Sequence, residues 1–504
     1  MSNEIIIIGG GHNGLTAAAY LAKAGRKVRL FEADTRLGGL ARSEPFHEGF
    51  ETPGVLHDAS SVRPWVVSDL GLHKHGLQSA AGPAKFTVPG ADGEPIYLEG
   101  NRISGAVSPT DVDRYAAFAG FVDRVRKPLM RILDNPPPDP LGPLLPLIGP
   151  LLGIRRLGGT DMTELIRIPP MASADWMRDA FANDRLGAAV AHRGLIGSWT
   201  GPWSPWTSAA LLFDLCASGT DIVGGPAALT DALAAAAKGY GAEINTGVPV
   251  ARILSNLDGV TGIELADGQK IESRIVVSTC DPRRTFLDLV GQRALTSEFA
   301  RSISNVRLRG TTAKLDLAIE GQLVDTKGNP VDRLQTGDSL NDLERSFDPI
   351  KYNEMSKTPL LDVRALGPKT GGRCPTGHQV VSVLVHYAPY ALTGGWTDGA
   401  RETLTQRALG VLRDACPGVA DQIVGHRLTT PCDLETRYGL TEGHIFHGEH
   451  APDQLMSLRP TVETGRYTTP IGGLFLCGSG SHPGGGITCA PGALGAKTIL
   501  SKTT

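Results

Sequence analysis

The chain has 504 residues, of which 41% are hydrophobic and 20% are charged, and its formal net charge is -3. A single core stops growing at roughly 250–300 residues, so we expect more than one domain. The small net charge excludes bulk electrostatic attraction to nucleic acid. No apolar run reaches the roughly 18–20 residues of a membrane helix, and no signal peptide is expected before the first strand. Seven scattered cysteines without CxxC spacing exclude a dithiol pair and favour a reducing, cytoplasmic compartment.

Residues 4–34 predict a strand, a glycine-rich turn, a helix and a second strand. Ile5 to Ile8 form an apolar run that is typical of a parallel strand buried on both faces. Three glycines follow in the spacing GxGxxG, namely Gly9, Gly11 and Gly14. They permit a tight turn, close approach of the backbone to a pyrophosphate, and close packing of helix on sheet. Glu32 ends the second strand and can accept hydrogen bonds from ribose hydroxyls, so the segment predicts a dinucleotide site.

The residues after Glu32 indicate which dinucleotide is bound. The glycine pair Gly38-Gly39 follows the acid by six residues, which resembles the flavoprotein extension in which a second glycine pair passes close to FAD. Arg36 and Arg42 flank this pair and can reach the pyrophosphate or the ribose. The alternative for each arginine is a position on the surface.

The middle of the chain, residues 221–286, predicts a return to the same domain. We expect a helix over 227–238, a strand over 243–254, and a hairpin from 259 whose second arm continues to residue 278. This order resembles the return segment of FAD oxidoreductases, in which a valine backbone meets the adenine. The resemblance points to Val250, for which a plain core position is the alternative.

Two segments between these parts have helical periodicity, namely 109–133 and 172–197. Ser173 is the expected N-cap of the second helix. The intervening residues 134–153 are rich in proline and leucine. We predict a helical cap inserted into the dinucleotide domain, with the proline–leucine segment in contact with a membrane surface or an apolar substrate. An exposed loop that packs locally is the alternative.

The last third of the chain predicts further strands and a second glycine-rich loop. Residues 310–320 and 378–390 are expected to form antiparallel strands of a substrate domain. The run GGLFLCG (472–478) is expected to be the last strand of the dinucleotide sheet. Gly478 and Ser479 can then lie against the pyrophosphate. The N–H groups of Gly486, Ile487 and Thr488 can point at the flavin ring and stabilise negative charge at N1 and O2.

The order of these motifs resembles the phytoene desaturase-like FAD-dependent oxidoreductases, relatives of the amine oxidases. Within them the chain is most similar to the branch called pyridine nucleotide-disulfide oxidoreductase domain-containing protein 2. Three segments carry the resemblance: DLGLHKHGL (69–77), TPCDLETRYGLTEGHIFHGEHAPDQLMSLRP (430–460) and LFLCGSGSHPGGGITCAPG (474–492).

The resemblance implies an α/β fold, α+β overall, with two domains. A Rossmann-like FAD-binding domain is expected from residues 1–80, 220–300 and 465–504. A substrate-binding domain with a mixed or antiparallel sheet and a helical cap is expected from residues 81–219 and 301–464.

The resemblance further implies FAD as cofactor and hydride transfer between flavin N5 and an apolar, unsaturated, isoprenoid- or carotenoid-like molecule, by dehydrogenation, desaturation or isomerisation. The chain has no second GxGxxG for NAD(P), so oxygen or a quinone is the expected electron acceptor. Two alternatives stay open. One is an oxidase of amines or other small polar molecules that uses oxygen, and the other is a flavoprotein interaction module without catalysis.

Four polar residues are candidates for a role beside the flavin. Lys314, in RGTTAK, resembles the amine-oxidase lysine that holds a water near flavin N5, and a surface lysine is its alternative. The other candidates are His447, Glu449 and His482, for which structural hydrogen bonding is the alternative. No metal site is predicted, because the thirteen histidines show no ligand spacing.

Overall fold

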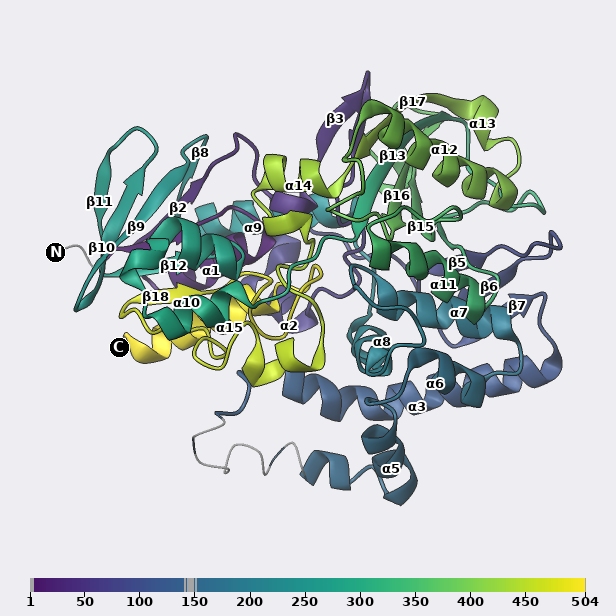
Figure 1. Ribbon diagram of the computed structural model, residues 1–504, viewed down its shortest axis with the longest axis horizontal. Helices are drawn as coiled ribbons and strands as arrows, with labels where there is room; N and C mark the ends of the chain where they lie inside the picture. The colour runs from purple at the N-terminus through teal and green to yellow at the C-terminus, as the bar shows by residue number, and fades with distance from the viewer. Residues whose placement is uncertain (1–3, 140–141, 143–148, 150–151, 504) are drawn as a thin grey trace.

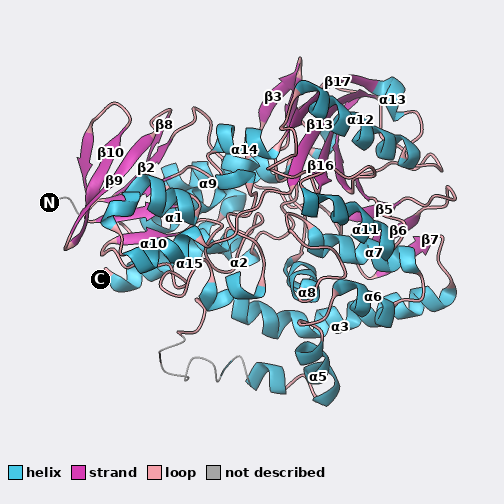
Figure 2. Cartoon of the chain, viewed as in Figure 1, coloured by secondary structure: helices cyan, strands magenta, loops and turns pink. Residues whose placement is uncertain are grey.

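The computed structural model describes residues 4–139, 142, 149 and 152–503. Its elements form two regions side by side, one built on a parallel sheet and the other on a larger mixed sheet with helices along its lower edge (Figure 1). Loops gather between the two regions (Figure 2). The mixed α/β architecture agrees with the predicted fold class.

Among the described residues, five strands form the parallel sheet. In spatial order they are β18 (Leu474–Leu476), β12 (Ile275–Ser278), β1 (Ile5–Ile8), β2 (Val28–Glu32) and β8 (Glu243–Thr246). Each neighbouring pair is parallel. The strands come from three distant parts of the sequence, so the sheet assembles only when the chain returns to it twice.

Strand β1 is buried on both faces, as its four isoleucines predict. Ile5 and Ile7 pack into the core beneath the helices, whereas Ile6 and Ile8 pack into a second core on the other face. A central strand of a parallel sheet is covered on both faces, which explains an apolar run in place of alternation.

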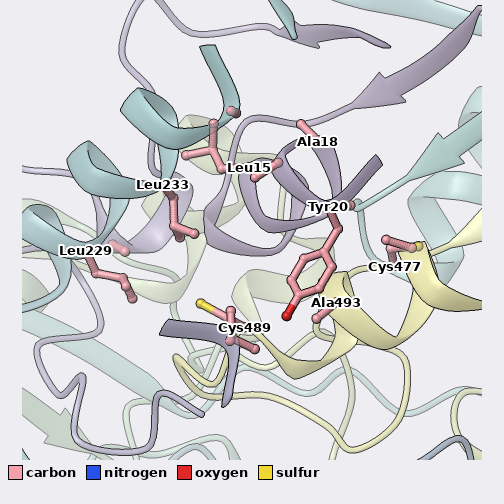
Figure 3. Packing of buried hydrophobic residues seen from close by; sticks show 14 of the residues in the cluster. Leu15, Ala18, Tyr20, Leu229, Leu233, Cys477, Cys489 and Ala493 are labelled. Carbon is pink, nitrogen blue, oxygen red and sulfur yellow. The ribbon is translucent and has the colours of Figure 1, made fainter. Parts of the chain in front are cut away.

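Three helices cover one face of this sheet: α1 (His12–Lys23), α9 (Gly225–Gly239) and α15 (Ala490–Lys502). Helix α1 packs against both of the others. Leu15 of α1 points toward Leu233 of α9, and Tyr20 points toward Ala493 of α15 (Figure 3). The small, fully buried residues 17–19 let the three helices approach closely.

The prediction of one strand over 243–254 is wrong. This stretch forms β8, in the parallel sheet, and β9 (Val250–Asn256), in a separate sheet with β10 (Gly259–Leu265) and β11 (Lys270–Glu272). Gly247, with a φ of +70°, turns the chain, and Pro249 lacks the N–H that a continuous strand needs. The predicted second hairpin arm likewise divides into β11 and β12.

The second region contains a mixed sheet of eight described strands. In spatial order they are β17 (Ile423–Thr429), β13 (Thr312–Glu320), β16 (His378–His386), β15 (Leu361–Leu366), β14 (Arg333–Gln335), β5 (Lys85–Val88), β6 (Ile96–Glu99) and β7 (Arg102–Gly105). Strands β13 and β16 are antiparallel, as predicted, and the pairing of β14 with β5 is parallel.

A layer of helices lies below this sheet (Figure 1). It contains α3 (Pro109–Leu133), α5 (Gly159–Arg167), α6 (Ser173–Ala180), α7 (Asp184–His192) and α8 (Thr207–Ala217). Helix α3 has the predicted bounds, because Ser108 and Asp111 form a capping box at its start.

The single helix predicted over 172–197 is wrong, since the chain forms α6 and α7 there. Asn183 starts the second of them by accepting a hydrogen bond from Leu186 N at 3.1 Å. Ser173 is not the N-cap of α6, because Ala172 holds that position and the Ser173 hydroxyl donates to Pro202 O at 3.3 Å.

The structure describes further strands and α-helices. They are β3 (Glu44–His47), β4 (Phe50–Thr52), α2 (Pro64–Leu70), α10 (Ser297–Ser304), α11 (Leu340–Phe347), α12 (Asp398–Ala415), α13 (Val419–Gln422) and α14 (Pro431–Tyr438). We propose that the chain divides into the two predicted domains, since the parallel sheet draws its strands from segments 1–80, 220–300 and 465–504 alone.

The predicted contact of residues 134–153 with a membrane or an apolar substrate falls in part outside the described residues, because 140–141, 143–148 and 150–151 are not among them. Within the described part of the chain, none of the helices is both long and apolar enough to cross a bilayer.

Candidate functional site

A cavity of about 400 Å³, here called the first cavity, lies where β1, β2 and β12 end, next to the start of α1. Many residues that the sequence predicts for the cofactor line it: Gly9, Gly11, Gly14, Glu32, Gly39, Arg42, Val250 and Ser479. His447, a candidate for chemistry, lines it as well. The structure thus brings together residues from both ends and from the middle of the chain.

The first glycine loop shapes one wall of this cavity. A Cβ on Gly14 would lie 2.0 Å from Gly9 O, and one on Gly9 would lie 2.4 Å from Thr279 Oγ1, so packing requires glycine at both positions. Gly11 is different, because the nearest atom to its Cβ position is Gly39 Cα at 3.9 Å. Helix α1 starts directly after Gly11 without a side-chain cap. The first turn can therefore present its N–H groups to an anion in the cavity.

Glu32 is fixed at the edge of the first cavity by the backbone. Its Oε2 accepts a hydrogen bond from Gly10 N at 2.6 Å, and its Oε1 accepts one from Asp34 N at 2.9 Å. Each carboxylate oxygen keeps a further lone pair, so the group can still accept from ribose hydroxyls.

The glycine pair lies beside the first loop, but only one of the two arginines reaches the cavity. Gly38 donates its N–H to Gly10 O at 2.8 Å. Arg42 is buried, pairs with Asp34 at 2.8 Å and lines the first cavity. Arg36 is exposed, donates to Ser43 O at 3.3 Å and lines neither of the cavities described here.

The C-terminal glycine loop packs against the first glycine loop. Asn13 Nδ2 donates to Ser479 Oγ at 3.1 Å. A Cβ on Gly478 would lie 2.4 Å from Thr279 O, so this glycine packs under β12 rather than facing the cavity. On the other side, a Cβ on Gly492 would lie 2.2 Å from Asn13 O. Asn13 therefore joins the two loops, a role that the sequence did not reveal.

Buried polar atoms of residues that line the first cavity are unsatisfied within the described part of the chain. The buried Arg42 Nε and His447 Nδ1 have no hydrogen-bond partner among the described residues. Such groups are costly to bury unless a ligand or water satisfies them. A dinucleotide, with phosphate and ribose oxygens, fits this donor set.

A second cavity of about 160 Å³ adjoins the first, and Leu56 lines both. Gly486, Ile487 and Thr488 line the second cavity. Its other walls are largely apolar: Leu133, Ile196, Phe213, Leu384, Phe446 and Leu455. The Thr488 N–H donates to Gly486 O at 3.1 Å, so the prediction that this N–H points at a flavin is not supported. The N–H groups of Gly486 and Ile487 remain the candidates for pointing at the flavin.

A buried polar chain ends at the second cavity. Lys314 Nζ donates to Asp316 Oδ1 at 2.7 Å and to Ser382 Oγ. His57, which lines the cavity, contacts Ser382 Oγ through Nδ1 at 2.8 Å and Asp362 Oδ1 through Nε2 at 3.2 Å. The Asp362 carboxylate can only accept, so the neutral His57 carries its proton on Nε2 and donates it to Asp362, and Nδ1 accepts from the Ser382 hydroxyl.

The protonation states of this chain follow from burial and pairing. Burial lowers the pKa of His57 despite its contact with Asp362, so the imidazole is neutral at pH 7. Burial raises the pKa of Asp362, but the hydrogen bond from His57 and the neighbouring histidines outweigh it and bring the pKa to about 2. The second cavity therefore holds an ionised carboxylate beside a neutral imidazole.

The remaining candidates for chemistry do not line either cavity. Lys314 is 1% exposed and stands behind His57 and Ser382. Glu449 is buried and pairs with Arg309 at 2.6 Å and Arg307 at 3.2 Å. His482 is a buried residue of the C-terminal loop, and its carbonyl accepts from Tyr467 Oη at 3.0 Å.

Replacing Lys314 is expected to destabilise the fold. Among the described residues, Lys314→Met leaves Asp316, itself 1% exposed, with Thr52 Oγ1 at 2.8 Å and Arg427 Nη2 at 3.5 Å as its side-chain partners. Breaking a buried ion pair from one side costs about 3 kcal/mol of unfolding free energy. The urea midpoint of unfolding measures this loss. The double variant Lys314→Met/Asp316→Leu is expected to recover most of it, and a single variant as stable as the wild type would contradict the pairing.

The sequence missed the polar residues in the wall of the second cavity. His57 and Asp362 belong to segments far apart in the chain. Arg193 and Asp214, which pair at 2.8 Å, lie 21 residues apart. None of the four lies in a recognisable motif. In the first cavity, the segment from Glu435 to Leu440 at the end of α14 was also missed.

Two parts of the chain match known families. Residues 7–62 match the NAD(P)-binding Rossmann-like domain, and residues 179–496 match the flavin containing amine oxidoreductase family, which is more than half of the chain. The chain belongs to the flavin-containing amine oxidoreductase family. It is therefore an oxidoreductase whose cofactor is FAD, and the donor set of the first cavity fits that cofactor.

Relatives extend over nearly the whole chain. Pyridine nucleotide-disulfide oxidoreductase domain-containing protein 2 of Rattus norvegicus is 30% identical, covering 99% of this chain and 93% of its own. One of the subunits of limonene dehydrogenase from Castellaniella defragrans is 26% identical, covering 98% and 94%. Hydroxyneurosporene desaturase of Cereibacter sphaeroides is 26% identical, covering 99% and 97%. These matches confirm the predicted resemblance.

The fold of the family is seen in a solved structure of putrescine oxidase, the wild type bound to putrescine. It superposes with a TM-score of 0.65 at 14% identity, covering 100% of this chain and 99% of that one. This likeness shows a shared fold, in which a Rossmann-like region adjoins a sheet-rich region.

Proposed function

We propose that this protein is an FAD-dependent dehydrogenase that takes a hydride from an apolar, unsaturated small molecule of isoprenoid type. The observation that carries the proposal is the second cavity, which has apolar walls and lies against Gly486 and Ile487. The bound flavin supplies N5 as the hydride acceptor. Relatives named for limonene and hydroxyneurosporene are consistent with an apolar substrate.

In this proposal the chain positions the cofactor and the substrate. The first cavity holds the dinucleotide through the N-terminus of α1, Glu32 and Arg42. The apolar walls of the second cavity exclude water from the substrate. Asp362, held ionised by His57, stabilises the positive charge that develops on a carbon that loses a hydride.

Amine oxidation is the family alternative, and the second cavity does not favour it. Among the described lining residues, each carboxylate already has a partner: Asp58 with Arg333 at 2.9 Å, Asp214 with Arg193 at 2.8 Å, and Asp362 with His57. A substrate ammonium would have to displace one of these partners.

Anaerobic bleaching of the flavin tests the proposal. Monoterpenes, diterpenes and carotenoids are added to the FAD-loaded protein, and the loss of flavin absorbance is recorded. We expect at least one class to reduce the flavin. Flavin that dithionite reduces but no isoprenoid does would overturn the proposal and favour an interaction module. Hydrogen peroxide released with amines in air would favour the oxidase.

A matched pair of variants assigns any bleaching to the second cavity. Ala210 lines that cavity, so Ala210→Trp is expected to abolish reduction by the isoprenoid while FAD stays bound. Ala266 is exposed in the turn between β10 and β11, so Ala266→Trp is expected to bleach like the wild type. Equal bleaching in both variants would place the substrate elsewhere.

A further inference from the structure

Arg459 is a buried positive charge that the protein itself does not balance. Its side chain is 1% exposed, and it forms no ion pair with any acid in the described part of the chain. Its guanidinium donates to five backbone carbonyls instead. These are Glu449 O at 3.0 Å, Gln454 O at 3.3 Å, Phe446 O at 2.9 Å, Gly448 O at 3.2 Å and Ser479 O at 2.9 Å.

The guanidinium lies directly behind both cavities. Ser479, whose carbonyl it binds, lines the first cavity, and Phe446, bound in the same way, lines the second. Gly484 also lines the second cavity, and a Cβ on it would lie 3.5 Å from Arg459 Nε. That Nε is buried without a hydrogen-bond partner among the described residues. One layer of backbone therefore separates the charge from the cofactor site.

The titratable groups around Arg459 leave its charge uncompensated. Burial, together with the charge of Arg459, lowers the pKa of His447 to about 4 and of His450 to about 3, so both are neutral. Burial and the same charge also lower the pKa of His444 and His482. Glu449 accepts from Arg459 through its backbone carbonyl, but its carboxylate is engaged by Arg307 and Arg309.

Buried charges in proteins are normally paired, because an isolated one is costly. Carbonyl dipoles solvate the guanidinium but do not cancel its charge. The partner that remains is an anion bound in the adjoining cavities, and FAD, the cofactor of this family, is an anion.

We propose that Arg459 stabilises the negative charge that the flavin gains on reduction and thereby raises its reduction potential. FAD takes up two electrons and one proton to reach its anionic reduced form, while Arg459 keeps its own proton throughout. Arg459 acts across the backbone near Gly484 without touching the ring. It is therefore a positioning residue, and it influences the flavin through its charge. The proposal rests on FAD as the cofactor and not on the identity of the substrate.

The midpoint potential of the FAD-loaded protein, measured against a reference dye, tests this proposal. Arg459→Gln removes the charge, and Arg459→Lys keeps it. We expect Arg459→Gln to lower the reduction equilibrium constant at least tenfold, which is about 30 mV for a two-electron couple. Arg459→Lys is expected to remain close to the wild type. An unchanged potential in Arg459→Gln with FAD bound would overturn the proposal.

The same variants distinguish two further outcomes. Weaker FAD binding with an unchanged potential would mean that Arg459 balances the pyrophosphate, which also overturns the proposal. If Arg459→Gln does not fold, Gln454→Glu replaces it. Gln454 Nε2 donates to Arg307 O and to Glu449 O, and Glu449 O also accepts from Arg459 Nη1, so the new carboxylate lies near the guanidinium and gives up these two donations. Gln454→Glu is expected to lower the potential. Gln454→Met loses the same two donations without adding a charge, and it is expected to keep the wild-type potential.

Discussion

A Gly11→Val protein is expected to fold and to lose its FAD. The Cβ position of Gly11 contacts only Gly39 Cα, at 3.9 Å, so the larger side chain fits the protein but projects where the pyrophosphate must approach the backbone. We expect the FAD content of the purified protein to fall on the order of tenfold or more, since close approach is the purpose of this glycine. The absorbance of the flavin, relative to protein, measures the effect.

The matched control is Gly410→Val in α12, where the nearest atom to the Cβ position is Arg413 Nη2 at 3.8 Å. This protein is expected to keep its FAD. A Gly11→Val protein that retains wild-type FAD content would contradict the assignment of the first cavity to the dinucleotide.

The fold is expected to lose stability steeply below about pH 6.5. Burial lowers the pKa of His386 and His450 to about 3, and of His12, His447 and His482 to about 4. The pKa values in the folded state lie below the unfolded value of 6.5. At a pH between the two values, the unfolded chain therefore binds more protons than the folded chain. The contribution of each histidine is complete above about pH 6.5 and is lost as the pH falls toward its folded pKa.

The magnitude of this loss is large because the histidines act together. Each contributes up to about 1.4 kcal/mol per pH unit. A typical domain is stable by only about 5–15 kcal/mol, so unfolding is expected within about two pH units. The thermal midpoint, recorded from about pH 8 to pH 4.5, measures the slope. His386→Asn, which does not titrate in this range, is expected to make the slope shallower. A midpoint that stays constant over this range would contradict the burial of neutral histidines.

The cofactor motif could be predicted from sequence because its parts are local. Gly9, Gly11, Gly14 and Glu32 lie within one strand–helix–strand unit, and their spacing determines where each stands. The choice between Arg36 and Arg42 could not be made in the same way. Both belong to one loop, and only the packing of Arg42 between Asp34 and the Tyr438 ring brings it to the cavity.

The second cavity could not be predicted because tertiary pairing creates it. His57 reaches Asp362 only because β15 pairs with β16 and a distant loop packs against both. Other errors had signals in the sequence. Gly247 and Pro249 mark the break between β8 and β9, and Asn183 marks the start of α7.

The crystal structure of the FAD-loaded protein tests the central claim most directly. Our account predicts the adenosine beside Glu32 and Val250, the pyrophosphate between Gly11 and Ser479, and the flavin ring in the second cavity against Gly486 and Ile487. Electron density for the ring outside the second cavity, or for FAD in the reverse direction, would contradict it.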